Sequence, residues 1–587
     1  MPRSCALALL LAAGLVRAVP AAADSYDDHA KLFVDGKYPS STACRTCHPT
    51  QYREWSVSPH SYAQLSPVFN AMQAAIGKRT SGTNGDFCIR CHTQPGMNLG
   101  EPTFQANADR HPIAREGVTC VVCHREPYEY GKVSGRFHLT EAPLTEPVNG
   151  PTGDAELKRV LAHPETYSVT ADPNQPGRKI HPDVRRFFAL RTPGFCGSCH
   201  DVTLGNGFRL EELFSSFKNS PAAHMGTTCQ DCHMGLEPGR PSGYAEGPAA
   251  IIDGVPTRPR RHANHMFPGP DYPIVHPGFF PHNPKAAELA SIQDWLQFDH
   301  KAGWGSEEFE KSVSSATRFP PRWSDAQDRR DARAVLAEQF ALLAEAQEKR
   351  LALLREGYRL GDLDIRQADA KKGLTFAVQV GNGMLGHNVP AGFDAERLVF
   401  LRVTVSDADG KVVFRSGDVD PDGDLRDLHS AFVQAGRLPL DKYLFNLQAT
   451  TIVKLPRGGE RDEVLATNLD VDPLAYVRPE TFSSILTGRP AGARTQRRDI
   501  TPRSSLWPEY RVKGSELTGK GPYQVNVKLI AAMVPSNLIR SIQFVGFDYG
   551  MSAKQVADAV TEGQLLLYDK TVTIGLDGPK TIRLAEK

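Results

Sequence analysis

Two cysteines that stand three positions apart, with a histidine directly after the second, occur five times in this chain. Each copy offers two thiols and one imidazole within five consecutive residues, and together the copies use all but one of the 11 cysteines. The copies are Cys44–His48, Cys88–His92, Cys120–His124, Cys196–His200 and Cys229–His233. The remaining cysteine, Cys5, lies close to the amino terminus.

This spacing suits the covalent attachment of haem. Two thiols one short turn apart can each add across a vinyl group of one porphyrin, and the next side chain then lies beneath the ring, where its imidazole can bind the iron. The thiols expected to form these links are Cys44, Cys47, Cys88, Cys91, Cys120, Cys123, Cys196, Cys199, Cys229 and Cys232, and the expected iron ligands are His48, His92, His124, His200 and His233. The motifs therefore predict five haem c groups, each with one iron.

The cysteine pairs also allow two other interpretations. A single pair is compatible with half of a zinc site or a thiol redox centre, and five pairs are compatible with a disulfide framework. Neither reading predicts a histidine after every pair. Histidine fills 19 of 587 positions, so a chance histidine at all five has a probability on the order of one in ten million. Haem attachment is the favoured interpretation.

The amino terminus has the pattern of a secretory signal. Arg3 gives a positive start, residues 6–16 form an apolar run too short to span a bilayer, and residues 21–23 offer an A-x-A cleavage site. We expect residues 1–23 to be removed and the mature protein to be exported to the periplasm or the cell surface. That location agrees with haem attachment of this kind, which takes place outside the cytoplasmic membrane.

Length and composition limit the classes of function. A chain of 587 residues is too long for one ordinary core, so two or more domains are expected. The formal net charge is +1, and no basic run argues for nucleic acid as a partner. The 50 Gly and 44 Pro predict much irregular backbone. Such a backbone suits a region whose apolar core is supplied by porphyrin.

The expected fold class is α+β with several domains. All five motifs fall within residues 24–284, which we expect to form an irregular, haem-cored domain. The long interval between the third and fourth motifs is rich in Pro, Gly and Asn and reads as a loop excursion. Residues 285–371 read as helical, with Ser324 as the cap of a long helix that ends near Tyr358.

Residues 372–587 alternate apolar and polar side chains, as strands do, and predict an antiparallel, immunoglobulin-like β-sandwich. The turn Asp407–Gly410 is a hairpin signal. The expected strands are 374–380, 397–405, 411–417, 445–455, 522–534 and 571–576, and residues 479–520 read as an irregular insertion.

The long helix has an expected apolar face, opposite a face of Arg and Glu expected to be solvated. The apolar face consists of Leu336, Phe340, Leu343, Gln347, Leu351 and Leu354.

The motifs EGVTCVVCH (116–124), FCGSCHDV (195–202) and GTTCQDCHM (226–234) resemble those of periplasmic or extracellular multihaem c-type cytochromes of anaerobic respiration. The resemblance covers about residues 40–270. It implies closely spaced haems with mainly His/His coordination, and redox partners such as cytochromes, quinol oxidoreductases or extracellular electron acceptors. Membrane association through a partner and oligomer formation are compatible with it. Pentahaem nitrite reductases replace one motif histidine by lysine, whereas all five motifs here end in histidine.

Each motif histidine leaves one iron position open, and the remaining histidines are numerous enough to fill all five. By resemblance, His60 in a W-x-x-S-x-H element, His265 and His262 after the last motif, and His387 in a GH-x-x-P-x-G element are candidate second ligands. A structural or surface role is the alternative for each. His138 and His224, which lie near the third and fifth motifs, are further candidates. If His387 binds iron, the β domain is held to the haem domain by a coordinate bond.

Three functions stay open on the sequence. Iron held by two imidazoles has no free position and exchanges electrons only, which favours an electron carrier with no catalytic residue. The first alternative is an oxidoreductase that acts on a small nitrogen or sulfur compound at one open haem. The second is a subunit of a haem filament or of a surface electron-transfer complex.

Overall fold

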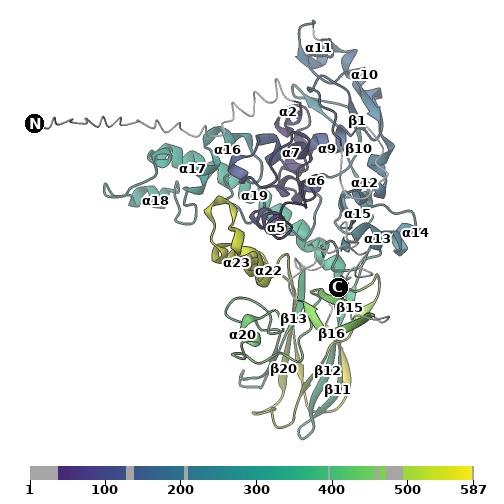
Figure 1. The fold of residues 1–587 in the computed structure, drawn as a ribbon, viewed down its shortest axis with the longest axis vertical. Coiled ribbons are helices and arrows are strands. Elements are labelled where there is room, and N and C mark those ends of the chain that lie inside the picture. The colour runs from purple at the N-terminus through teal and green to yellow at the C-terminus, as the bar shows by residue number, and fades with distance from the viewer. Residues whose placement is uncertain are drawn as a thin grey trace, which may run out of the picture.

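The computed structural model places short helices and loops in its amino-terminal half and antiparallel sheets towards its carboxyl terminus (Figure 1). It describes residues 37–126, 138–172, 174–203, 209–393, 397–456, 462–470, 493–496 and 498–584, with the backbone course alone for the strands between 450 and 496. The expected leader 1–23, with Cys5, lies outside the described residues. No described helix is both long enough and apolar enough to cross a membrane.

The first three motifs lie on a series of short helices. Serine side chains cap α2, α4 and α5 by accepting backbone N–H bonds, and proline begins several of the helices, where its missing N–H has no partner to lose. The helices are α2 (Ser41–Arg45), α3 (Pro49–Ser56), α4 (Pro59–Tyr62), α5 (Pro67–Arg79), α6 (Ile89–His92), α7 (Gln94–Asn98), α8 (Pro112–Arg115) and α9 (Cys120–His124).

Residues 138–284 combine short helices with two-stranded ribbons. The predicted loop excursion between the third and fourth motifs contains regular structure in its described part. The helices are α10 (Ala155–Leu161), α11 (Pro164–Tyr167), α12 (Pro193–Gly197), α13 (Leu213–Lys218), α14 (Pro221–His224) and α15 (Cys229–His233). The paired strands are β1 (Val148–Gly150) with β4 (Val184–Arg186), β2 (Val169–Thr170) with β3 (Arg178–Lys179), β5 (Val202–Thr203) with β6 (Arg209–Glu211), β7 (Ala245–Pro248) with β10 (Pro259–His262), and β8 (Ile251–Ile252) with β9 (Val255–Pro256).

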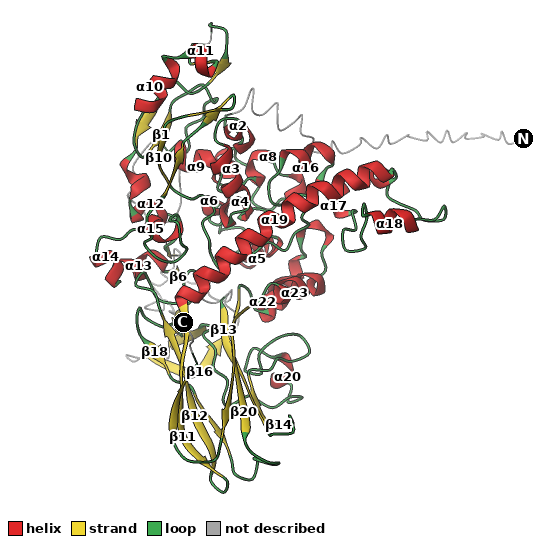
Figure 2. Cartoon of the chain, turned by 180° about the vertical axis from the view of Figure 1, so that it is seen from behind, coloured by secondary structure: helices red, strands yellow, loops and turns green. Residues whose placement is uncertain are grey.

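The long helix predicted from the sequence is α19 (Ala326–Gly357), and it runs from the helical part to the sheets (Figure 2). Its cap is Asp325, whose side chain accepts from the Gln327 N–H, and not the predicted Ser324. The predicted apolar face is wrong at Phe340, which is 41% exposed. Residues 285–311 form three short helices, α16 (Pro284–Leu289), α17 (Ile292–Leu296) and α18 (Glu307–Ser312).

The expected solvated face of α19 is also wrong in part, because Arg329 and Arg350 are buried. Arg329 donates from Nε to Glu310 at 2.8 Å and from Nη1 to the Trp323 carbonyl at 2.7 Å. An arginine on a helix can be buried when its charge is paired and its hydrogen bonds are satisfied, which the helical period alone does not reveal.

Two antiparallel sheets pack against each other at the carboxyl-terminal end. One has the order β18–β12–β11–β22, with β19 also on β12, and the other has the order β14–β13–β20–β21. Side chains from both sheets, among them Leu363, Phe376, Val403 and Val527, form one buried cluster. The strands are β11 (Tyr358–Asp369), β12 (Gly373–Asn382), β13 (Leu398–Ser406), β14 (Val412–Ser416), β18 (Ser505–Leu506), β19 (Glu509–Val512), β20 (Tyr523–Ala532), β21 (Leu565–Ile574) and β22 (Lys580–Arg583). The immunoglobulin-like assignment stays a prediction.

The strand predictions hold in most places and fail in three. The hairpin at Asp407 joins β13 to β14 as expected, and Asp407 accepts the N–H groups of Asp409 and Lys411. Strand β11 lies in the segment predicted to be helical, and β18 and β19 lie in the predicted insertion. Residues 445–449 are not in a strand, because β15 (Thr450–Pro456) begins later and pairs with β16 (Asp462–Asp470) and β17 (Ala493–Gln496).

A pair of helices between β20 and β21 returns to the haem-motif region. Helices α22 (Ser536–Ile542) and α23 (Ala553–Glu562) pack on α5, where Ile539 and Val556 share a buried cluster with Val68 and Ile76. The sequence pattern predicts these residues inside the β-sandwich, and that prediction is wrong. Their return ties the end of the chain to its beginning.

Candidate functional site

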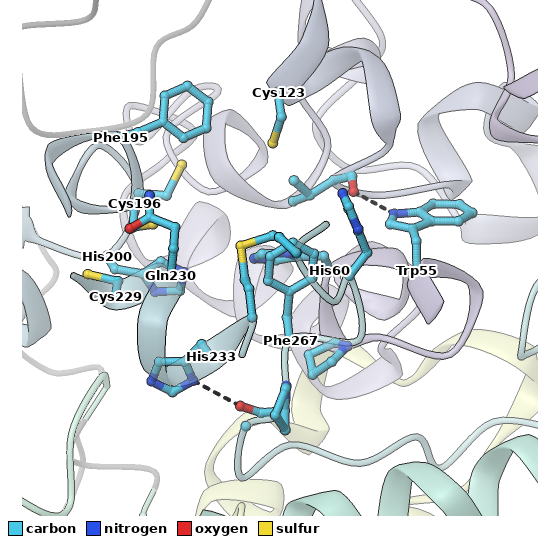
Figure 3. Close-up of a pocket in the computed structure, with 18 of the residues that line it drawn as sticks. Trp55, His60, Cys123, Phe195, Cys196, His200, Cys229, Gln230, His233 and Phe267 are labelled. Atoms are coloured by element: carbon cyan, nitrogen blue, oxygen red, sulfur yellow. Dashed lines mark hydrogen bonds between the residues drawn. The ribbon is translucent and has the colours of Figure 1, made fainter. Parts of the chain in front are cut away.

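All five cysteine–histidine motifs line one continuous cavity of about 1520 Å³. Figure 3 shows a part of its wall, with Cys123, Cys196, His200, Cys229 and His233. Every cysteine and histidine of the motifs contributes to its wall. The ten described cysteines are free thiols, so the structure contradicts a disulfide framework among them. One shared cavity is what an array of closely spaced cofactors requires.

The five motif histidines share one orientation. In four of them Nδ1 faces a main-chain carbonyl oxygen, which can only accept, so Nδ1 carries the proton and the Nε2 lone pair is left for a metal. The pairs are His48 with Ala249 at 2.7 Å, His92 with Ala63 at 3.0 Å, His124 with Asn149 at 2.8 Å and His233 with Pro268 at 3.1 Å. In the fifth, His200 Nδ1 faces the carboxylate of Glu211 at 3.2 Å.

Two predicted second ligands lie opposite motif histidines. The ring centroids of His60 and His200 are 6.3 Å apart, and those of His387 and His233 are 6.5 Å apart with the planes only 11° from parallel. Two imidazoles that bind one metal ion from opposite sides, through bonds of about 2.0–2.1 Å, have their centroids roughly 6 Å apart. Both pairs therefore fit an iron atom between them, and the second brings the loop after β12 to the fifth motif.

Three further histidines, His181, His262 and His265, line the cavity with a buried Nδ1 atom that makes no hydrogen bond, although His265 Nδ1 lies 3.7 Å from the Glu54 carboxylate. Burial lowers the pKa of His181 to about 4, and the nearby His48 contributes to this shift. Buried polar atoms are normally satisfied, so these three point to a group that the protein atoms alone do not supply. The sequence places His181 in the long irregular segment between the third and fourth motifs, away from every motif, so it was not among the predicted ligands.

The other two predicted ligands lie elsewhere. His138 and His224 are exposed and are not among the described residues that line the cavity. His224 Nδ1 donates to the Ser220 carbonyl within its own helix at 2.8 Å. Iron ligation by either residue stays a prediction that this geometry does not support.

Burial keeps most of the cavity histidines in the neutral form that binds metals. It lowers the pKa of His60 to about 3 and the pKa values of His124 and His233 to about 4. His200 is the exception. Burial acts to lower its pKa, but the hydrogen bond and the charge of Glu211 outweigh this and raise the pKa of His200 to about 9.

Contacts between thiols show which motifs are neighbours. Cys120 is hydrogen-bonded to Cys44, Cys91 to Cys199, and Cys229 to Cys196, and each contact raises the pKa of the first thiol named. The first motif therefore lies beside the third, and the fourth lies between the second and the fifth. Neighbours in space are not always neighbours in the sequence.

The charge of the cavity wall suits an anionic cofactor. Basic side chains outnumber acidic ones, and the buried Arg350 has Nε and Nη1 atoms without a hydrogen-bond partner. Porphyrin propionates are carboxylates that arginine recognises well. The basic residues are Arg125, Arg178, Lys179, Arg191, Arg240, Arg260, Arg261, Arg350, Arg397 and Arg503, and the acidic ones are Glu156, Glu211, Asp231, Asp271 and Glu356.

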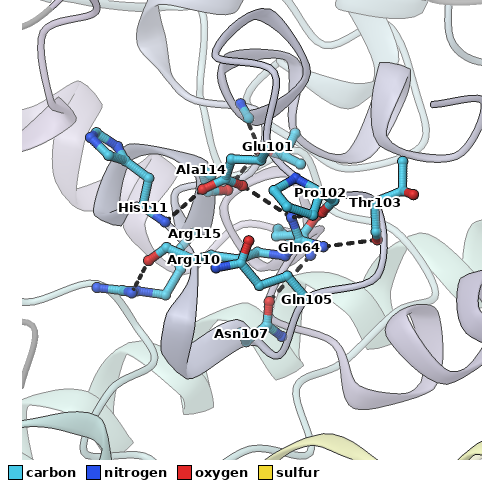
Figure 4. Close-up of polar contacts among 12 residues, drawn as sticks. Gln64, Glu101, Pro102, Thr103, Gln105, Asn107, Arg110, His111, Ala114 and Arg115 are labelled. Carbon is cyan, nitrogen blue, oxygen red and sulfur yellow. Dashed lines mark hydrogen bonds and ion pairs between the residues drawn. The ribbon is translucent and has the colours of Figure 1, made fainter. Parts of the chain in front are cut away.

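A buried ion pair fixes the segment between the second and third motifs (Figure 4). Arg110, whose side chain is fully buried, donates to Glu101 Oε2 at 3.0 Å and to the Thr103 carbonyl at 3.1 Å. The other oxygen of Glu101 accepts the His111 N–H at 2.6 Å. Because α7 precedes this network and α8 follows it, the network fixes the loop that joins the two helices.

The thiols, the oriented imidazoles, the orphaned histidine nitrogens and the basic wall all fit covalently bound haem. No curated protein matches the chain. Among solved structures, a penta-heme cytochrome c552 from Thermochromatium tepidum is similar, with 16% identity, a TM-score of 0.47, and coverage of 91% of this chain and 98% of that one. The family model for cytochrome c554 and c-prime matches residues 43–125, which contain the first three motifs. Residues 43–125 thus match a multihaem c-type cytochrome family, and the two later motifs repeat the same haem-attachment pattern.

Proposed function

We propose that the chain carries electrons through five covalently bound haem c groups, most of them held between two histidines. One observation carries the proposal: ten histidines line the shared cavity, five of them in the motifs and five outside them. They are His48, His60, His92, His124, His181, His200, His233, His262, His265 and His387. Iron with two imidazole ligands has no free position for a substrate, so its chemistry is one-electron exchange.

The ligand pairs are assigned where ring geometry supports them. His200 and His60 hold the fourth haem, and His233 and His387 hold the fifth. The first and third haems draw their second ligands from His181, His262 and His265. The haems supply reversible one-electron redox chemistry, and the chain orients the imidazoles, shields the cavity from water and balances the propionates.

The parts of the chain have different roles in this proposal. Residues 24–284 bind the haems, the helical segment begins at 285, and the β domain ends the chain. The predicted boundary at 372 moves to 358, because β11 continues directly from α19. Residues 533–563 belong in space to the haem-binding part, since α22 and α23 pack on α5.

The partners proposed are other redox proteins, such as cytochromes and quinol oxidoreductases, or an extracellular electron acceptor, and the location is outside the cytoplasmic membrane. The motif contacts support a route in which the second haem exchanges electrons with the fourth, and the fourth with the fifth. The first and third haems form a second close pair.

A haem count combined with spin-state spectroscopy tests the proposal. A pyridine haemochrome assay on the mature protein is expected to give five haems per chain, and low-temperature electron paramagnetic resonance is expected to show mainly low-spin iron. Replacing His60 or His387 by alanine should each turn one haem high-spin. Replacing the exposed His138 or His224 should change nothing, which makes them matched controls. Fewer than five haems, or a mainly high-spin spectrum, refutes the proposal.

A second candidate is an oxidoreductase that acts on a small nitrogen or sulfur oxyanion at the second haem. The observation in its favour is the surroundings of His92, whose ring stacks on Phe69 at 3.7 Å and whose charged neighbours include Glu211 and Asp271. Arg350, which also lines the cavity and lies 4.4 Å from the Tyr272 ring centroid, would bind the anion. Binding of cyanide or nitrite to one ferric haem supports this candidate, and no binding eliminates it. The filament alternative stays a prediction, tested by whether dilution turns a haem high-spin.

A further inference from the structure

We infer that Glu211 makes the haem of the fourth motif the most reducing of the five, by accepting the Nδ1 proton of its ligand His200 with a carboxylate. The inference rests on the proposed haem-binding function and deepens it. It assigns a positioning and tuning role to a residue that lies outside every motif.

Glu211 is the only charged acceptor among the partners of the five motif histidines. The other four donate Nδ1–H to neutral main-chain carbonyls, whereas His200 Nδ1 lies 3.2 Å from Glu211 Oε1. The Glu211 side chain is 19% exposed and that of His200 is 45% exposed, and both residues line the cavity.

The backbone holds Glu211 in this position. Strand β6 ends at Glu211 and pairs with β5, where Glu211 lies opposite Val202, two residues after His200. The nearby cation, Arg209, is engaged by Asp201 and by Glu212, at 3.2 Å from the latter. The ribbon therefore presents one carboxylate to one ligand, with the neighbouring arginine turned to other partners.

A carboxylate acts on the iron through the imidazole. A charged acceptor pulls the Nδ1 proton more strongly than a neutral carbonyl does, which makes the ring a stronger donor to the metal. Stronger donation and the nearby negative charge both favour the ferric state over the ferrous one. Both effects lower the reduction potential, and ligand hydrogen bonding is one of the main means by which proteins tune haem.

The position of the fourth haem determines how its lower reduction potential affects electron transfer. The Cys196 and Cys199 thiols contact Cys229 and Cys91, so the fourth haem lies between the second and the fifth. The centre that holds an electron least strongly then stands in the middle of this part of the route. It sets the energy barrier for exchange between the two flanking haems.

Redox titration of Glu211→Gln tests the inference, with Glu212→Gln as the matched control. Glutamine keeps an acceptor but removes the charge, and Glu212 is the next residue, paired with Arg209 and 29% exposed. Loss of such a supporting partner typically changes metal affinity or activity by about 10- to 100-fold, and we take the same range for the redox equilibrium. A tenfold change is about 59 mV for one electron. One of five waves should therefore rise by about 60–120 mV in Glu211→Gln, and none in the control.

A second measurement does not depend on whether Glu211→Gln assembles. A methionine ligand raises haem potential, so His60→Met marks the wave of the fourth haem in a protein whose Glu211 is intact. The inference expects this wave to be the most negative of the five in the wild type. It is overturned if another wave is the most negative, or if Glu211→Gln moves no wave while all five haems are present. A haemochrome count below five instead refutes the proposed function.

Discussion

Replacing Gly117 by alanine should detach His60 from its iron. Gly117 has a φ of +64°, and a Cβ built on it lies 2.6 Å from the His60 carbonyl oxygen. The N–H of the next residue, Val118, donates to the same oxygen at 3.0 Å. The close approach of these two backbone segments thus places His60, on the short helix α4, over the fourth motif.

The size of the effect follows from these distances. A carbon–oxygen contact is ordinarily about 3.3 Å or longer, so the methyl group requires the two segments to separate by about 0.7 Å. Metal–ligand distances tolerate only about ±0.2 Å. Alanine also pays about 1–2 kcal/mol for the left-handed conformation, and the loss of the Val118 hydrogen bond costs about 1 kcal/mol. We expect a loss of about 2–3 kcal/mol in stability, together with one displaced ligand.

Gly100→Ala is the control for this substitution. Gly100 has a similar φ of +73°, but a Cβ there meets nothing within 4 Å, so it carries the backbone strain without the clash. Low-temperature electron paramagnetic resonance should show one high-spin haem in Gly117→Ala and none in Gly100→Ala, and denaturant titration should show the larger loss in Gly117→Ala. A Gly117→Ala protein with every haem low-spin, or an equal high-spin signal in the control, refutes the reasoning.

Three further predictions concern the scaffold. Glu310→Gln should cost about 3–5 kcal/mol at neutral pH, because it leaves the buried Arg329 without its counter-charge. Arg329 lowers the pKa of Glu310 in the folded protein, so this stability is present above the usual Glu pKa and is lost as the pH falls through the lowered value; wild-type and variant melting curves should converge in acid. Arg110→Met should lower the urea midpoint more than Lys285→Met, which removes an exposed pair, and equal midpoints contradict the role of the network. His387→Ala should increase proteolysis between the haem-binding part and the sheets, and an unchanged cleavage pattern contradicts a coordinate link.

The parts of the fold that follow local rules were predictable from the sequence. The five motifs, the 3.6-residue period of α19 and the alternation in β12, β13 and β20 each depend on residues close together in the chain. The predictions fail where contacts between residues far apart in the sequence determine the local structure. Asp325 caps α19, whereas the sequence pattern predicted the preceding residue, Ser324. Arg329 is buried because Glu310 lies beside it.

The candidate site shows the same limit. His60 and His387 lie in short elements with a recognisable pattern, and both are found opposite motif histidines. His181 carries no such pattern, and only the fold brings it into the cavity. Glu211 was not foreseen, because its significance comes from a single contact with His200 that the β5–β6 ribbon creates.

The loop after β12 and the end of α19 help to enclose the cavity that the motifs line. The loop after β12 supplies His387 and, with Met384 and Val389, lines the cavity. Helix α19 contributes Arg350 and Leu353 to the same wall. On the proposed ligand assignment, a chain that ended before β11 would lose His387, the residue opposite His233, and would expose the fifth motif to water. Since solvent exposure and axial ligation both set haem potential, the proposed function gives the β domain a part in setting the potential of that haem.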